Sequence, residues 1–203
     1  MLSKTNAVRF GRLLCASLVM LIGLSGCLST KSYVDPALPT VAKGDLVAPA
    51  EPRPVQILFE FRTKGSANAA ATSQVRARVV AVAAESGLFD GIAGAGDATS
   101  GGVLKVVIDN VPITDNAAAK GFGTGLTFGL AGSMVTDGYI CTMTYTRDGK
   151  VTETTIRHAL HTTIGNKAGP EGLAPVTMAD GVNQVMDQLV WNGLQQLSSQ
   201  GAF

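Results

Sequence analysis

Few side chains in this sequence could act as nucleophiles, general bases or metal ligands. The two histidines are His158 and His161, and alternation along a strand would place residues three apart on opposite faces. A metal site shared by both is therefore not expected, and no paired-cysteine or His-Glu-x-x-His pattern is present. No serine lies in a Gly-x-Ser-x-Gly motif. The sequence thus predicts a protein that is not an enzyme, without catalytic, cofactor-binding or metal-binding residues, although a hydrolase with an unrecognised site stays open.

Cys27 follows an N-terminal segment with a distinctive order of charge and hydropathy. Residues 1–12 carry three basic residues and no acid, and residues 13–24 are mostly apolar. Small residues then precede the cysteine in the tetrapeptide Leu24-Ser25-Gly26-Cys27. This order is typical of a secretory signal peptide, and the apolar run is shorter than the ~20 residues that a membrane-spanning helix needs. Residues 1–26 are therefore predicted to be a signal peptide.

The same tetrapeptide resembles the lipobox of bacterial lipoprotein precursors, Leu-(Ala/Ser)-(Gly/Ala)-Cys. The resemblance implies lipidation of Cys27, cleavage after Gly26 and acylation of the new amino terminus. Leu28 stands where an aspartate would retain such a protein in the inner membrane. By the sorting rule of that family, the outer membrane is the expected destination, with the protein on its periplasmic face.

Cleavage would change the composition of the chain. Removing 26 of the 203 residues leaves 177, and it takes three of the 16 basic residues but none of the 15 acidic ones, for a net charge of about −2. That balance implies no basic surface for nucleic acid. Cys15 leaves with the signal, so Cys141 is the one thiol besides Cys27, and we expect it to be buried and apolar.

Residues 27–54 are predicted to be a lipidated, proline-rich tether. Five prolines, Pro36, Pro39, Pro49, Pro52 and Pro54, oppose both a helix and a central strand. The alternative is a strap that lies on the folded domain, with Tyr33, Val34 and Leu38 as its apolar contacts.

Residues 55–200 carry the patterns of one folded domain. Alternation predicts strands over 55–62 and 103–111, and helical spacing predicts a helix over 66–86 that stops at Gly87. Asp148-Gly149 predicts a two-residue hairpin turn, which sets Tyr145 opposite Thr152, Met143 opposite Thr154, Cys141 opposite Ile156 and Tyr139 opposite His158. His158 and Tyr139 are expected to form a hydrogen-bonded core pair. Thr177 is the expected N-cap of a last helix to about residue 198.

This order, β-α-β-β-β-α, predicts an α+β fold. We expect a two-layer sandwich of about four strands with both helices on one face and a right-handed parallel β-α-β crossover. The lipobox, the element order and the apolar last helix resemble the periplasmic domains of ABC-transporter auxiliary lipoproteins and YajG-type outer-membrane lipoproteins.

Residues 121–135 form an apolar, glycine-rich insertion between the second predicted strand and the hairpin. Gly121, Gly125 and Gly129 recur every four residues, a spacing that lets helices approach closely in lipid and resembles glycine zippers. Fifteen helical residues reach only about 22 Å, short of a ~30 Å hydrocarbon core. Membrane contact is the first hypothesis, through Gly121, Phe122, Gly125, Leu126, Phe128, Gly129 and Leu130. Packing on the domain and a ligand-binding loop are the alternatives.

Together these features predict a lipid-anchored protein of the bacterial envelope that works by interaction. The expected partners are the membrane, through the lipid anchor, and an envelope protein or a second copy of the chain. No cofactor is expected besides the covalent lipid. A periplasmic module that binds a small molecule or a lipid between helices and sheet is the alternative.

Overall fold

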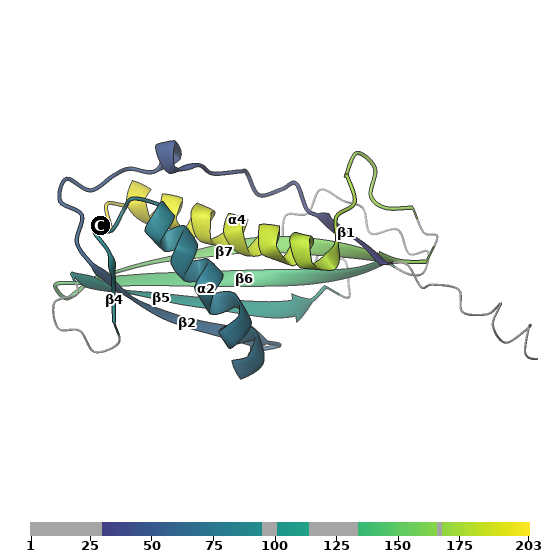
Figure 1. Ribbon diagram of the computed structural model, residues 1–203, viewed down its shortest axis with the longest axis horizontal. Helices are drawn as coiled ribbons and strands as arrows, with labels where there is room; N and C mark the ends of the chain where they lie inside the picture. Colours follow the sequence, from purple (N-terminus) through teal and green to yellow (C-terminus); the bar gives the residue numbers. More distant parts are fainter. Residues whose placement is uncertain (1–29, 95–100, 114–133, 166–167) are drawn as a thin grey trace, which may run out of the picture.

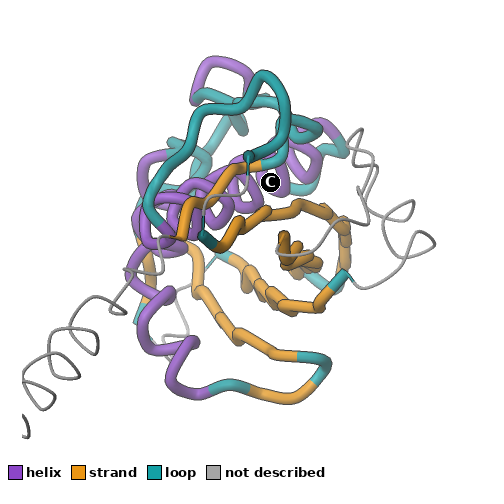
Figure 2. The backbone as a smooth tube through the Cα atoms, turned by 90° about the vertical axis from the view of Figure 1, so that its right-hand side faces the viewer, coloured by secondary structure: helices purple, strands orange, loops and turns teal. Residues whose placement is uncertain are grey.

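The computed structural model describes residues 30–94, 101–113, 134–165 and 168–203. They form one seven-stranded mixed sheet with two α-helices packed on the same side of it (Figure 1). The strand order is β1-β7-β6-β5-β2-β3, with β4 beside β2. The elements are β1 (Thr30–Val34), η1 (Lys43–Asp45), β2 (Val55–Thr63), β3 (Ser66–Ala67), α2 (Ala69–Glu85), β4 (Ile92–Ala93), β5 (Gly102–Pro112), β6 (Met134–Arg147), β7 (Lys150–Ile164) and α4 (Met178–Ser199). Viewed along the strands, the sheet is curved (Figure 2).

The predicted α+β class is confirmed, but the predicted count of about four strands is wrong. Three further strands were missed. β3 and β4 have two residues each, too short to show an alternating pattern, and β1 lies in the segment predicted as a tether.

β2, α2 and β5 form the predicted β-α-β unit. The two strands are parallel and in register from Val55↔Gly102 to Thr63↔Asn110. The helix begins three residues later than predicted because Ser66 and Ala67 turn back and pair with the end of β2. Asn68 is its N-cap and accepts a hydrogen bond from the backbone N–H of Ala71 at 3.0 Å.

The β6–β7 hairpin has the predicted register. All four predicted pairs are present, and the turn residues Asp148 and Gly149 have φ values of 50° and 76°. Positive φ at both turn positions matches the right-handed twist of the strands, which explains why Asp-Gly is favoured there. The strands run further than predicted, since β6 begins at Met134. Met134 and Val135, assigned to the glycine-rich insertion, therefore belong to the sheet.

α4 supplies most of the core contacts over β6 and β7. Its side chains Val185, Leu189, Val190, Leu194 and Leu197 are all 1% exposed or less. Gly193 lets α4 approach β6 closely, because it has no side chain at the contact. A Cβ added there would lie 2.0 Å from Met143 Sδ. Thr177 is the N-cap, as predicted.

Residues 30–54 lie on the domain, so the tether prediction is wrong for them and the strap alternative is correct. β1 pairs with β7, Tyr33 is only 4% exposed, and Val34 and Leu38 pack against the core. Further along, side chains of α4 form hydrogen bonds with backbone groups of residues 30–54, here called the strap. Asn192 donates to the carbonyl of Pro39 at 2.9 Å, and Ser198 accepts from Val47 N at 3.2 Å. Prolines exclude a strand ladder after β1, and these side-chain bonds take its place.

Candidate functional site

The residues predicted to act at a membrane lie outside the described part of the chain. This holds for Cys27 and for the seven proposed contact residues, Gly121, Phe122, Gly125, Leu126, Phe128, Gly129 and Leu130. The nearest described residue to Cys27 in the sequence is Thr30, and the described residues that flank the glycine-rich insertion are Ile113 and Met134. The geometry around these three residues is therefore the part of the prediction that the structure addresses.

The sheet brings these three residues to the same end of its strands, here called the Thr30 end. Thr30 pairs with Ile164, and Met134 pairs with Thr163. Ile113 joins them through the hydrogen bond from its backbone N–H to the carbonyl of Thr136, at 3.0 Å. Strands in a sheet are about 4.8 Å apart, so Thr30 and Met134, on either side of β7, are separated by about 10 Å.

A buried polar cluster secures β1 at this end of the sheet. Asp35 Oδ2 lies 3.1 Å from His161 Nε2, and Thr136 Oγ1 lies 2.9 Å from His161 Nδ1. Asp35, His161 and Thr136, here called the polar clamp, are 1%, 0% and 3% exposed. Asp35 also accepts from the backbone N–H of Ala37 at 2.8 Å. The clamp thus joins the strap to β6 and β7, residues more than a hundred positions away in the sequence.

The electrostatics of the clamp favour an ionised Asp35. Burial alone would raise the pKa of this carboxyl, but the hydrogen bonds from His161 and from Ala37 N outweigh burial and bring the pKa below its usual value. An ionised carboxylate only accepts hydrogen bonds, so His161 Nε2 carries a proton and donates it. The Thr136 hydroxyl is the partner of the other ring nitrogen, Nδ1.

The clamp contains a hydroxyl, an imidazole and a carboxylate, the groups of a hydrolytic triad. A substrate could not reach them in this conformation, because even Thr136 is only 3% exposed. Neither of the grooves described below is lined by any of the three. The arrangement instead fastens the strap to the sheet.

His158 lies on the opposite face from His161, as predicted, and faces α4. Its predicted partner was wrong: Tyr139 is its neighbour in register, but His158 Nε2 bonds to Gln188 Oε1 at 2.5 Å. His158 Nδ1 is buried without a hydrogen-bond partner among the described residues. Burial lowers the pKa of His158, and the bond to Gln188 opposes this only in part. Within the described ranges, no three His, Cys, Asp or Glu side chains are grouped to hold a metal.

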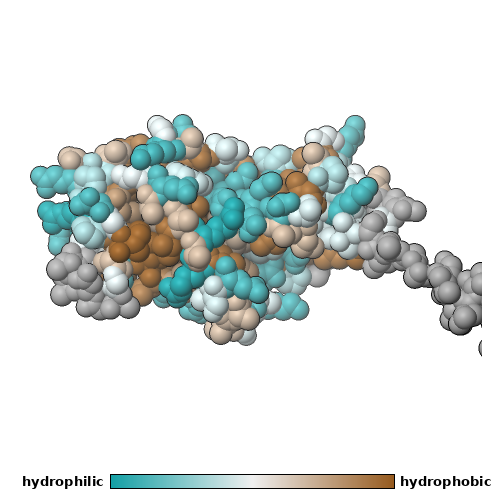
Figure 3. Space-filling view, viewed as in Figure 1, coloured by the Kyte–Doolittle hydropathy of each residue, from teal (hydrophilic) through white to brown (hydrophobic). Residues whose placement is uncertain are grey.

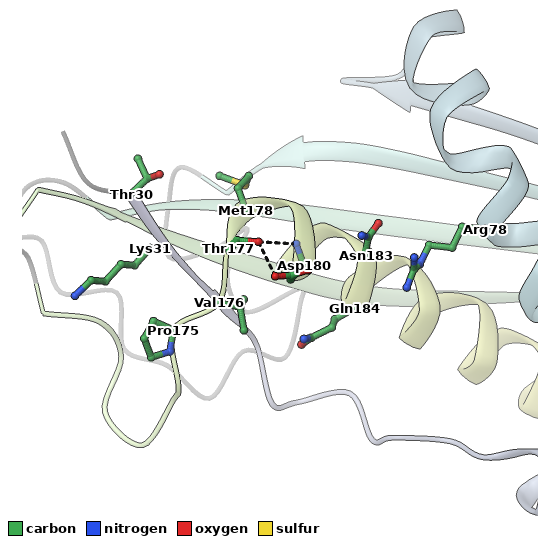
Figure 4. A pocket seen from close by; sticks show the side chains of 10 residues that line it. All are labelled: Thr30, Lys31, Arg78, Pro175, Val176, Thr177, Met178, Asp180, Asn183 and Gln184. Carbon is green, nitrogen blue, oxygen red and sulfur yellow. Dashed lines mark hydrogen bonds between the residues drawn. The ribbon is translucent and has the colours of Figure 1, made fainter. Parts of the chain in front are cut away.

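An open groove of about 980 Å³ lies at the Thr30 end, beside the first turn of α4 (Figure 4). Lys31 and Pro175 stand on one side of it and Arg78 on the other. The helix terminus is already capped, since Thr177 Oγ1 accepts from Asp180 N at 3.1 Å and donates to Asp180 Oδ2 at 2.7 Å. The Asp180 carboxylate therefore occupies the place where the helix would favour an external anion. The sequence analysis did not identify this groove.

A second groove, of about 830 Å³, runs between α2 and α4. Its walls are mostly apolar, with Val75, Val182 and Trp191 among them. Arg78 and Asp187 bridge the helices across it through two bonds of 2.6 Å. The face of the molecule that carries the helices is a mosaic of polar and apolar residues, with apolar ones gathered beside α2 (Figure 3).

Among the described residues, no helix has both the length and the hydropathy to cross a membrane. α4 is the longest at 22 residues, and it buries its apolar side against the sheet.

Comparisons with known proteins find distant similarity of fold only. No protein-family model and no curated protein matches the chain. A solved structure of a PelC dodecamer from Paraburkholderia phytofirmans shares 14% identity, covering 84% of this chain and 98% of the PelC chain, with a TM-score of 0.35. Rare lipoprotein B from Shewanella oneidensis also shares 14% identity, covering 72% of this chain and 96% of that one, with a TM-score of 0.35. TM-scores of this size carry no information about activity or partners.

Proposed function

We propose that this protein is a lipid-anchored protein of the bacterial envelope that acts through interactions rather than catalysis. The carrying observation is that Leu24-Ser25-Gly26-Cys27 ends three positions before Thr30, the first residue of a strand built into the sheet. Lipid on Cys27 would hold the whole domain at a bilayer, and several acyl chains make such an attachment long-lived. Leu28 favours the periplasmic face of the outer membrane.

The glycine-rich insertion supports a second contact with the same membrane. Its flanking residues Ile113 and Met134 lie at the Thr30 end, which is also the end that the chain reaches from Cys27. A lipid anchor and an apolar segment that leave the domain at one end can engage one bilayer together. The domain itself would then support an envelope or transport assembly, through an envelope partner or a second copy of the chain.

The anchor is tested by comparing wild-type protein with Cys27→Ser in cells. We expect the wild type to fractionate with membranes and its amino-terminal peptide to carry the mass of a lipidated cysteine. Cys27→Ser should lose that mass. Cys141→Ser is the matched control and should behave as the wild type does. An unmodified Cys27 in the wild-type protein would contradict the proposal.

The insertion is tested separately, in a chain that lacks residues 1–26 and carries Cys27→Ser. If the insertion contacts lipid, the double variant Leu126→Asp/Phe128→Asp should abolish flotation with phospholipid vesicles. Val47→Asp/Val151→Asp adds the same charge at two exposed apolar positions of the domain, 59% and 61% exposed, and should float as the parent does. Equal flotation of both double variants would exclude membrane contact by the insertion.

An interaction role is tested by crosslinking in cells. Recovery of an envelope protein or of a second copy is the expected result. Crosslinking that recovers neither would count against this role.

The second candidate function is binding of a small molecule or a lipid, and the groove between α2 and α4 is the observation that favours it. Native mass spectrometry of the purified protein should then show a bound molecule. Ala81→Trp, which fills the groove, should displace it, whereas Ala84→Trp on the same helix but outside the groove should not. A native mass equal to that of the protein alone would exclude this binding function.

A further inference from the structure

We propose that the Thr30 end of the domain lies against the phospholipid headgroups of the membrane that holds Cys27. The surface concerned comprises Lys31 and residues 168–178, which lead into the first turn of α4. The β6–β7 turn would point away from the membrane. This orientation rests on the proposed lipidation and adds to it a defined membrane-facing surface.

The main observation behind this proposal is the short connection between Cys27 and Thr30. Thr30 follows Cys27 by three residues, so the two Cα atoms are at most about 11 Å apart. The headgroup region of one leaflet is itself about 5–8 Å thick. Even a fully extended connection would therefore leave the Thr30 end within a few ångströms of the headgroups.

The strap cannot lengthen this connection while the domain stays folded. Five residues of β1 pair with β7, and Ser32 exchanges backbone bonds of 3.1 and 2.8 Å with Val176. Asp35 of the polar clamp follows directly after β1 and is held by His161 of β7. Release of residues 30–54 as a free tether would require all of these bonds to break together.

The distribution of charge agrees with this orientation. Within Lys31 and residues 168–178, the charged side chains are Lys31 and Glu171, and most of the other residues are apolar or small. The first turn of α4 adds one more charged side chain at this end, Asp180. The opposite end, at the β6–β7 turn, carries Glu51, Arg53, Asp90, Arg147, Asp148 and Lys150. Removing charge from water is costly, so the Thr30 end is the one that loses less by facing a headgroup layer.

The two ends are far enough apart to be distinguished. β7 has 15 residues and runs from one end to the other, a length of about 46 Å. Figure 1 shows β1 and the connection into α4 at one extreme of the long axis, with the C-terminus near the other.

Short-range fluorescence quenching tests the orientation in the mature lipoprotein, purified from membranes and reconstituted into vesicles with spin-labelled headgroups. Met178→Cys and Val151→Cys place a label at exposed apolar positions, 43% and 61% exposed, at opposite ends. Cys141 is 0% exposed, and burial raises the pKa of its thiol to about 12, so it stays unlabelled. We expect the label at 178 to lose most of its fluorescence and the label at 151 almost none.

Equal quenching at the two positions, or stronger quenching at 151, would overturn the orientation. The mass of the amino-terminal peptide, measured on the same samples, separates this failure from a failure of the lipidation itself. A flexible 20-residue Gly/Ser insertion between Ser29 and Thr30 adds a mean reach of about 25 Å. Quenching at 178 should then fall sharply, and unchanged quenching would show that the short connection is not what holds this end at the membrane.

Discussion

The two ends of the sheet are held together by different kinds of interaction. At the Thr30 end, a buried carboxylate, imidazole and hydroxyl join the strap to β6 and β7. At the end that carries the β6–β7 turn, the ring of Phe203 packs edge to face with those of Phe89 and Tyr145, with centroid separations of 5.1 and 4.8 Å. Apolar contacts tolerate small shifts, whereas buried hydrogen bonds are directional and costly to leave unmade. The end that would carry the load of a membrane anchor thus has the more geometrically specific connection.

Removing His161 should have the largest effect. His161→Ala leaves the Asp35 carboxylate buried without its ring partner, and we expect the free energy of unfolding to fall by about 3–5 kcal/mol in urea titrations. At the turn end, Asp148→Asn removes the exposed ion pair with Arg147 and keeps a residue that accepts positive φ, so a change of about 0.5 kcal/mol or less is expected. Similar losses in the two variants would show that the clamp is not a special connection.

Shortening the Phe203 side chain tests the aromatic cluster at the end that carries the β6–β7 turn. Phe203→Ala should lower the free energy of unfolding by about 2 kcal/mol, through lost apolar burial and lost ring contacts. Phe203→Leu keeps most of the apolar area and should recover more than half of that loss. Thermal unfolding of both variants gives the measurement, and a Phe203→Ala protein as stable as the wild type would show that the cluster does not hold this end.

Acid should affect the Thr30 half of the molecule through His158 and Asp35. The pKa of His158 is below its usual value of about 6.5 in the folded protein, so the unfolded chain binds the proton first. Stability from His158 is therefore present above about pH 6.5 and lost as the pH falls below it, by at most about 1.4 kcal/mol per pH unit. The pKa of Asp35 is also lowered, so its contribution is present above about pH 4 and is lost as the pH falls through its folded-state value.

Urea titrations between pH 8 and pH 5 separate the two groups. His158→Gln should flatten the slope in that range, while Asp148→Asn should leave it unchanged. An unaltered slope in His158→Gln would exclude His158 as the responsible group. Asp35 and His161 are the charged or titratable neighbours of His158, and the same titration of Asp35→Asn shows how far Asp35 contributes.

The bridge between the helices should contribute less than the polar clamp or the aromatic cluster. Arg78 and Asp187 make two short bonds, but their side chains are 39% and 33% exposed, so water screens the pair. We expect Arg78→Ala to lower the free energy of unfolding by less than about 1 kcal/mol and Arg78→Lys by less still. A loss as large as that of His161→Ala would mean that the helix pair, rather than the clamp, dominates this half of the domain.

Local signals predicted the middle of the domain well. Asp148-Gly149 was sufficient to predict the register of β6 and β7, because a two-residue turn determines which residues face each other. The apolar spacing of α4 and the cap at Thr177 were sufficient to predict that helix. The same reasoning failed for β1, whose five residues show no alternation of their own and pair with a strand some 130 residues away. It also gave His158 the wrong partner, because Gln188 reaches it only across the packed helix.

The sequence by itself determined the features that depend on neighbouring residues: the signal-like segment before Cys27, the α+β class, the hairpin register and the last helix. Only the tertiary structure decided that residues 30–54 are a strap, that Asp35, His161 and Thr136 form one buried cluster, and that Thr30, Ile113 and Met134 share one end. Turns, caps and apolar periods are encoded over a few residues, whereas these contacts join segments far apart in the chain. Their partners are set by the packing of the whole sheet.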